Sequence, residues 1–194
     1  MKPIFGILVI LVICFTSCDN RKTVQQSLAE SIEKFKKNVD FETNVYIPET
    51  YLEREVDTLM SNDFRVTIKT YSDMMNSVRF SKIKDTINHQ THYRNFKFDI
   101  TVTRNEEELY NQSFNKQSVN EAFQFKANLP HDSSLYNFDT LAVLKSIQVN
   151  QESSESDRVG IDIMYGVPET DRYALYRLNI DEDGQSNIIQ VEVK

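Results

Sequence analysis

Three oxygen-bearing side chains at alternate positions near the C-terminus could bind a hard cation. Asn179, Asp181 and Asp183 precede Gly184. This order matches the first half of a calcium-binding loop, in which the glycine permits a sharp turn. The twelfth position of the loop, however, is Gln190 rather than a bidentate Glu. An Asp-Gly turn between two strands explains the same residues without a metal, so we predict a hairpin and keep calcium as the alternative.

The histidines give a second metal hypothesis. His89 and His92 are three residues apart, and His131 stands elsewhere in the chain. On a helix this spacing could place two imidazoles on one metal ion, whereas a strand turns them to opposite faces. Because an alternating strand pattern follows His92, we expect exposed polar histidines, no metal and no cofactor.

No residue set identifies a reaction. The sequence contains neither HExxH nor GxSxG, the signatures of common metal-dependent and serine hydrolases. Sites made of Ser, His and Asp, or of paired carboxylates, form only in the fold and stay open. Tyr165, Tyr173 and Tyr176 cluster near the last hairpin and could anchor a partner or a sugar. We expect them instead to pack in the core with their hydroxyls at its rim.

Composition excludes two classes of ligand. The 194 residues carry a formal charge of −7, which disfavours binding to phosphate backbones and therefore to nucleic acid. Only four glycines occur and none cluster, so no loop is available to bind nucleotide phosphates through backbone N–H groups. Hydrophobic residues make up 40%, which is enough for a globular domain with its own core.

The first residues have the order of an exported leader. Lys2 precedes an apolar run, Ile4–Phe15, of twelve residues. This run is too short to span a bilayer, which takes about 20 residues, and it has the length of a signal-peptide core. Thr16 and Ser17 then precede Cys18, the only cysteine left after such a leader is removed. Disulfides and cysteine nucleophiles are therefore not expected.

The segment Thr16–Cys18 resembles the lipobox of bacterial lipoproteins, where a peptidase cuts before a cysteine that receives a diacylglycerol. Phe15 departs from the usual Leu, a relaxation similar to that of Bacteroidota-type lipoproteins. The resemblance implies a signal peptide over 1–17 and a lipidated tether over 18–22, with lipid attachment at Cys18. It further implies a membrane-anchored protein of the cell envelope, in the outer membrane, with the membrane face left open. The alternative is a secreted protein with a stray cysteine.

A helix is predicted directly after the tether. Apolar residues recur at intervals of four, four, three and four, which gives one stripe on a helix. The stripe consists of Val24, Leu28, Ile32, Phe35 and Val39. Thr23 and Gln26 fit a capping box at its start. We expect this helix to pack on the domain, with a helix lying on the membrane as the alternative.

The rest of the chain alternates in the manner of strands with one covered face. We predict strands over 64–69, 96–102, 109–114, 141–149, 159–165, 173–180 and 188–193, with a helical start as the alternative for 141–149. A turn is expected over 104–108, a short helix over 119–126 and a loop over 151–157, while 41–60 fits either a helix or a strand. The expected fold is α+β: a strand-rich antiparallel sheet of hairpins and meander with one or two packing helices, in a single globular domain over 23–194.

Three threonines lie in a repeated triplet. Asp-Thr followed by Leu or Ile occurs at Thr58, Thr86 and Thr140. The triplet resembles the acceptor motif for O-glycosylation of exported Bacteroidota-type proteins, which implies glycans at these residues.

The sequence therefore predicts an envelope lipoprotein that acts by binding. Its expected partner, besides the membrane reached through the lipid, is another envelope protein or a glycan. The alternatives are a carboxylate-based hydrolase, which needs crowded acids with raised pKa values, and a structural envelope component.

Overall fold

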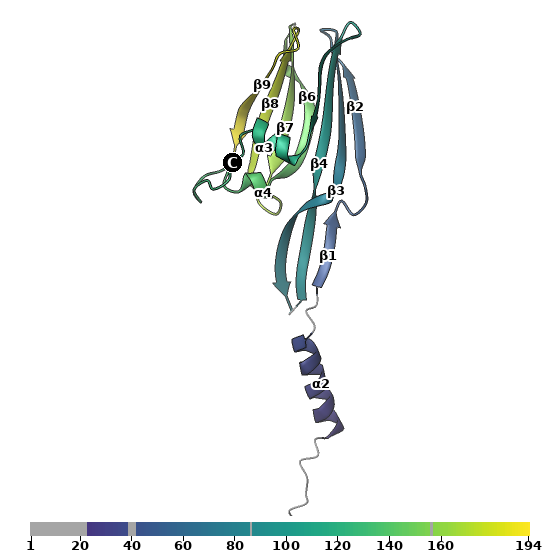
Figure 1. Ribbon diagram of the computed structural model, residues 1–194, viewed down its shortest axis with the longest axis vertical. Coiled ribbons are helices and arrows are strands. Elements are labelled where there is room, and N and C mark those ends of the chain that lie inside the picture. The colour runs from purple at the N-terminus through teal and green to yellow at the C-terminus, as the bar shows by residue number, and fades with distance from the viewer. Residues whose placement is uncertain (1–22, 39–41, 86, 156) are drawn as a thin grey trace, which may run out of the picture. The chain divides into compact units, whose positions relative to one another are not determined.

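The computed structural model describes residues 23–38, 42–85, 87–155 and 157–194 (Figure 1). The chain divides into two units between Phe41 and Glu42, although we expected one domain from residue 23 onward. Each unit is described by itself. The leader, Cys18 and Thr86 lie outside the described residues.

The first unit contributes helix α2 (Val24–Asn38). The predicted capping box is present at its start. The Thr23 backbone N–H donates to Gln26 Oε1 at 3.0 Å, and the Gln26 N–H donates to Thr23 Oγ1 at 3.2 Å. These bonds satisfy donors that the first turn of a helix otherwise leaves free, which fixes where α2 begins.

In the second unit, the first sheet is built on two long antiparallel strands, β3 (Phe64–Lys84) and β4 (Ile87–Arg104). β2 (Glu53–Leu59) pairs with β3. β1 (Glu42–Ile47) pairs in parallel with the first part of β4, and β5 (Glu107–Phe114) pairs antiparallel with its last part. The order through this sheet is therefore β1-β4-β3-β2, with β5 beside β4.

The second sheet is an antiparallel meander in sequence order: β6 (Val143–Glu155), β7 (Arg158–Gly166), β8 (Tyr173–Asp181) and β9 (Ser186–Val193). Residues of β8 alternate between half-buried and buried along its whole length. This alternation is what a strand with one covered face requires. The two sheets pack against each other as a sandwich (Figure 1). β1 and the adjoining ends of β3 and β4 extend past the meander.

The inward faces of both sheets form one hydrophobic core. Its strand residues at 2% exposure or less include Phe64, Val66, Ile68, Phe98, Ile100, Val102, Val159, Ile161, Ile163, Leu178 and Ile180. Burying one such side chain contributes about 1.5–3 kcal/mol. The β-branched and aromatic residues that produced the two-residue period in the sequence are thus the residues that hold the sheets together.

Two short helices connect the sheets, α3 (Lys116–Ala122) and α4 (Phe138–Leu141). Between them Phe123 stacks on Tyr176 with ring centroids 4.6 Å apart and meets Tyr165 edge-on at 5.8 Å. Both tyrosines are at most 3% exposed, so they are core residues, as the sequence predicted. Aromatic packing fixes the crossover from the first sheet to the second.

The α+β, strand-rich fold is confirmed, but one local prediction needs correction. Residues 151–155 belong to β6, and Glu155 pairs with Arg158 across a tight turn; the predicted loop over 151–157 is wrong. The run of polar residues over 151–157 suggested a loop, but an edge strand tolerates polar side chains. Residues 41–60, left open between helix and strand, contain β1 and β2.

Candidate functional site: a cleft between two strand edges

A cleft of about 500 Å³ lies between β2 and β6. One wall comes from β2, β3 and β4 and the other from β6. The volume falls within the range of about 300–1,000 Å³ that is typical of ligand sites. β2 and β6 are edge strands of their sheets, so the cleft opens along one side of the sandwich.

Both strands present an unpaired backbone edge. β2 pairs with β3, and β6 pairs with β7; in the part of the chain that the structure describes, neither has a strand on its other side. An edge strand carries a row of free N–H and C=O groups that can pair with an added strand. Two such edges on one cleft make an extended peptide the ligand that fits its hydrogen-bonding groups.

The inside of the cleft is apolar. Val56 lies opposite Ile68 in the first sheet, and Ile147 lies opposite Ile163 in the second. Ile68 and Ile163 are buried in the core, whereas Val56 and Ile147 are partly exposed and line the cleft. The hydrophobic core therefore reaches the surface between the two edges, where an entering side chain could bury it further.

The charge of the cleft is opposite in sign to that of the whole chain. Arg54 and Lys145 are the charged residues that line the cleft, and no acidic residue does so. On the opposite face of β2, by contrast, Glu53 forms an ion pair with Lys69, whose ammonium group donates a hydrogen bond to Glu53 Oε1 at 2.9 Å. That hydrogen bond holds the pKa of the Glu53 carboxyl below its usual value. The cleft is thus a cationic site on an acidic protein.

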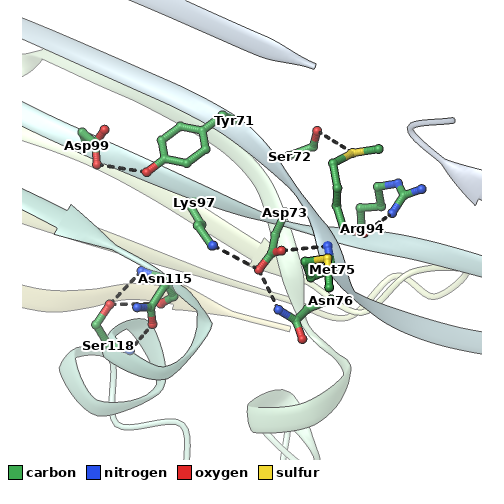
Figure 2. Close-up of polar contacts among 11 residues, drawn as sticks. Tyr71, Ser72, Asp73, Met75, Asn76, Arg94, Lys97, Asp99, Asn115 and Ser118 are labelled. Atoms are coloured by element: carbon green, nitrogen blue, oxygen red, sulfur yellow. Dashed lines mark hydrogen bonds and ion pairs between the residues drawn. The ribbon is translucent and has the colours of Figure 1, made fainter. Parts of the chain in front are cut away.

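A wide bulge interrupts β3 near this region. Between Ser72 and Ser77, four residues face a single residue of β4. The carboxylate of Asp73 fixes the bulge (Figure 2) by accepting the Met75 backbone N–H at 3.0 Å and the Asn76 amide at 2.8 Å. Burial alone raises the pKa of Asp73, but these hydrogen bonds outweigh it and hold the pKa below its usual value. Asp73 therefore acts as a structural acceptor for the turn.

The side chains of the candidate calcium site form hydrogen bonds within the β8–β9 hairpin. Asp181 Oδ1 accepts the backbone N–H groups of Asp183, at 3.1 Å, and of Gln185, at 2.8 Å. The Asn179 amide donates to Asn187 at 3.1 Å. Among the described residues, no group of three His, Cys, Asp or Glu side chains could hold a metal ion. Calcium stays a prediction that the hairpin itself does not require.

The histidines are used within the sheet. His89 Nδ1 lies 2.8 Å from Thr43 Oγ1, and His92 Nε2 lies 3.0 Å from Asn44 Oδ1. Both partners are on β1, at neighbouring positions that point to opposite faces. His131 lies 3.4 Å from the Tyr136 hydroxyl. The structure therefore separates the two imidazoles that the sequence raised as metal ligands.

Two of the three candidate glycosylation sites can be placed. Thr58 is half-buried and lines the cleft. Thr140 is exposed on α4, where its hydroxyl donates to the Asn137 carbonyl at 3.2 Å. Modification at these residues stays a prediction, and a glycan at Thr58 would fill part of the cleft. Tyr173, the third tyrosine of the last hairpin, is half-buried.

Sequence reasoning missed one buried amine. Lys116 Nζ donates to the backbone carbonyls of Phe138, at 3.1 Å, and Ala142, at 2.5 Å. Burial lowers the pKa of Lys116 to about 8. The Phe138 carbonyl also accepts the Ala142 backbone N–H at 3.2 Å, so the ammonium group adds a second donor there and ties Lys116 to the end of α4. Nothing near Lys116 in the sequence indicates the contact, since its acceptors lie 22 and 26 residues away.

The cleft residues also escaped sequence reasoning. Arg54 and Val56 lie in 41–60, which fitted either a helix or a strand, and Lys145 and Ile147 lie in the predicted strand over 141–149 with no sign that they line a site. They meet because long-range strand pairing brings β2 and β6 to the same side of the sandwich.

Comparisons with known proteins give no relative: no family model matches the chain, and no curated protein matches it significantly. In the described ranges, no helix has both the length and the apolar character needed to cross a bilayer.

Proposed function

We propose that this protein is a lipid-anchored component of the bacterial cell envelope whose strand-rich domain binds an extended peptide segment of another envelope protein. The segment adds a strand in the cleft between β2 and β6. The observation that carries the proposal is the pair of unpaired strand edges on one apolar cleft. Main-chain hydrogen bonds supply affinity in such complexes, and alternate side chains supply specificity.

The charge of the cleft defines the segment further. Arg54 and Lys145 favour a strand that carries a carboxylate side chain. Val56 and Ile147 favour apolar side chains at the alternate positions that point inward. The ligand is therefore an alternating apolar segment with one Asp or Glu.

The cleft gives little support to the hydrolase alternative. A carboxylate-based hydrolase needs acids crowded in a cleft with raised pKa values. No acidic residue lines this cleft. The described acids with a resolved shift all have a lowered pKa: Glu53, Asp57, Asp73, Asp157, Asp162, Glu169 and Asp171.

Site-specific photo-crosslinking in intact host cells tests the binding. A photoreactive amino acid replaces exposed Gln148 at the cleft or, as a matched control, Val191 on the β9 edge, which is 43% exposed. We expect a discrete protein adduct from Gln148 alone, mapped by mass spectrometry to an extended segment. An adduct to a glycan, an equal adduct from both positions, or no adduct would overturn the proposal.

Hydrogen exchange on the purified complex provides the second measurement. Amides in Glu53–Leu59 and in residues 144–151 should gain protection, while those of Ser186–Val193 should not, because only the first two edges receive the added strand. Protection spread evenly over both sides of the sandwich would argue against strand addition.

The anchor is tested separately, so that the two claims can fail independently. Cells grown with an alkyne-bearing palmitate analogue should label the native protein and leave Cys18→Ala unlabelled. Equal labelling of both would remove the lipid anchor and leave the peptide-binding proposal in place.

A further inference from the structure

Within its own unit, α2 leaves its apolar stripe exposed. Val24, Leu28, Ile32 and Phe35 are 85%, 60%, 47% and 59% exposed. At about 100° per residue they lie within about 80° of one another around the helix. Four large apolar side chains on one helical face call for a covering surface.

The expected anchor restricts what that surface can be. Val24 follows Cys18 by six residues. At about 3.5 Å per residue, this tether reaches about 21 Å at most. Acyl chains on Cys18 would therefore keep the first turn of α2 within about 21 Å of the bilayer, close enough for the helix to lie on its surface.

The net charge of the segment that contains α2 also differs in sign from that of the rest of the mature chain. Residues 19–37 contain five basic residues (Arg21, Lys22, Lys34, Lys36 and Lys37) and three acidic ones (Asp19, Glu30 and Glu33), a net charge of +2. Residues 39–194 contain the other 16 basic residues of the mature chain and 26 acidic ones, a net charge of −10. Anionic headgroups attract the first part and repel the second.

From these observations we propose that α2 is an interfacial helix, which lies on the bilayer surface beside the lipid anchor with its apolar stripe in the membrane. The occupant of the stripe is a lipid surface that contains anionic headgroups. Such a helix holds the membrane more strongly than acyl chains alone, because the apolar stripe and the basic residues each add to binding. This inference rests on the expected lipid at Cys18 and is independent of the peptide cleft.

A second copy of the chain fits the stripe less well. The four apolar residues are spaced by four, four and three, whereas a coiled coil alternates three and four over at least about three heptads. α2 has 15 residues, about two heptads.

Tryptophan fluorescence tests the proposal, since the chain contains no Trp. Phe35→Trp places the probe in the stripe. Glu33→Trp places it about 145° from the centre of the stripe, at an exposed position. Each full-length lipidated variant is reconstituted in phosphatidylethanolamine–phosphatidylglycerol vesicles, with and without brominated acyl chains.

We expect the Phe35→Trp emission to be blue-shifted and quenched at least threefold more by brominated lipid than the Glu33→Trp emission. Replacing phosphatidylglycerol with phosphatidylcholine should reduce this difference. Equal weak quenching at both positions would overturn the proposal. A blue shift that brominated lipid does not quench, and that disappears when the protein is diluted in lipid, would identify a second copy as the occupant and also overturn it.

Discussion

The two open sides of the sandwich are built differently. On the side of β5 and β9, a Cβ added to Gly184 in the β8–β9 turn would lie 2.3 Å from the Leu109 carbonyl oxygen. On the same side Arg104 donates to Glu182 at 2.9 Å. On the side of β2 and β6, a cleft of about 500 Å³ separates the strands instead.

This difference shows that the cleft is not a general result of stacking two sheets. On one side, here called the closed side, a turn that only glycine fits and an ion pair connect the β8–β9 turn with β4 and β5, while on the other side an apolar cleft lies between β2 and β6. Unprotected edges favour aggregation, and proteins usually cover them. The open edges of β2 and β6 beside an apolar cleft therefore support the proposed peptide ligand.

The largest loss of stability is expected from a substitution on the closed side, where the β8–β9 turn meets β5. Gly184→Ala adds a Cβ at a positive φ of 74° and against backbone, so we expect unfolding free energy to fall by about 3 kcal/mol. Urea denaturation provides the measurement. Gly166→Ala is the milder control, because Gly166 has no positive φ and its added Cβ would lie 3.1 Å from the flexible Lys145 side chain and 3.2 Å from the Arg172 carbonyl oxygen. Equal losses in both variants would mean that the close approach to β5 does not hold this side together.

Alkaline pH tests the buried amine of Lys116 in the crossover between the two sheets. Burial lowers the pKa of Lys116 to about 8, below its unfolded value of about 10.4. Between these values the unfolded chain binds more protons, so stability should rise by about 2 kcal/mol from pH 8 to pH 10. Above pH 10 stability should fall again, because burial raises the pKa of Tyr176 to about 12.

Urea midpoints across this range, compared between the native protein and Lys116→Met, provide the measurement. The rise should be absent from the variant. An identical rise in both proteins would assign it to another group.

A smaller effect is expected from a charge inside the cleft. Ile147→Glu places a carboxylate where the apolar side chain of the ligand should enter, so binding should weaken at least tenfold, or about 1.4 kcal/mol. Ile189→Glu on β9, at a side chain that is 45% exposed, is the matched control and should bind normally. The adduct formed at Gln148 reports the loss, with melting temperatures to show that both variants fold. Unchanged crosslinking in Ile147→Glu would place the ligand elsewhere.

The smallest effect concerns the ion pair of the closed side. Glu182→Gln removes the carboxylate that Arg104 contacts, and the Glu182 side chain is 57% exposed. Because water and salt screen exposed pairs, the loss of unfolding free energy should be about 0.5 kcal/mol. A loss as large as that of Gly184→Ala would show that charge, rather than the glycine turn, closes this side.

Local sequence patterns predicted the elements that depend on local rules. The alternation at 64–69 and 96–102 marked parts of β3 and β4, and Asp183-Gly184 marked the β8–β9 turn. β1 gave no such signal, because all six of its residues are exposed and none alternates between core and solvent. Its strand conformation comes from pairing with β4, 46 residues away.

The sequence by itself determined which segments are strands with a buried face, where α2 begins, and the acidic balance that disfavours nucleic acid. These properties follow from side-chain period, capping and charge within short stretches of chain. Only the tertiary structure decided the strand order, the two unpaired edges and the cationic, apolar cleft between them. Residues 54 and 145 meet at that cleft through pairings spread along most of the domain, and no local pattern encodes such pairings.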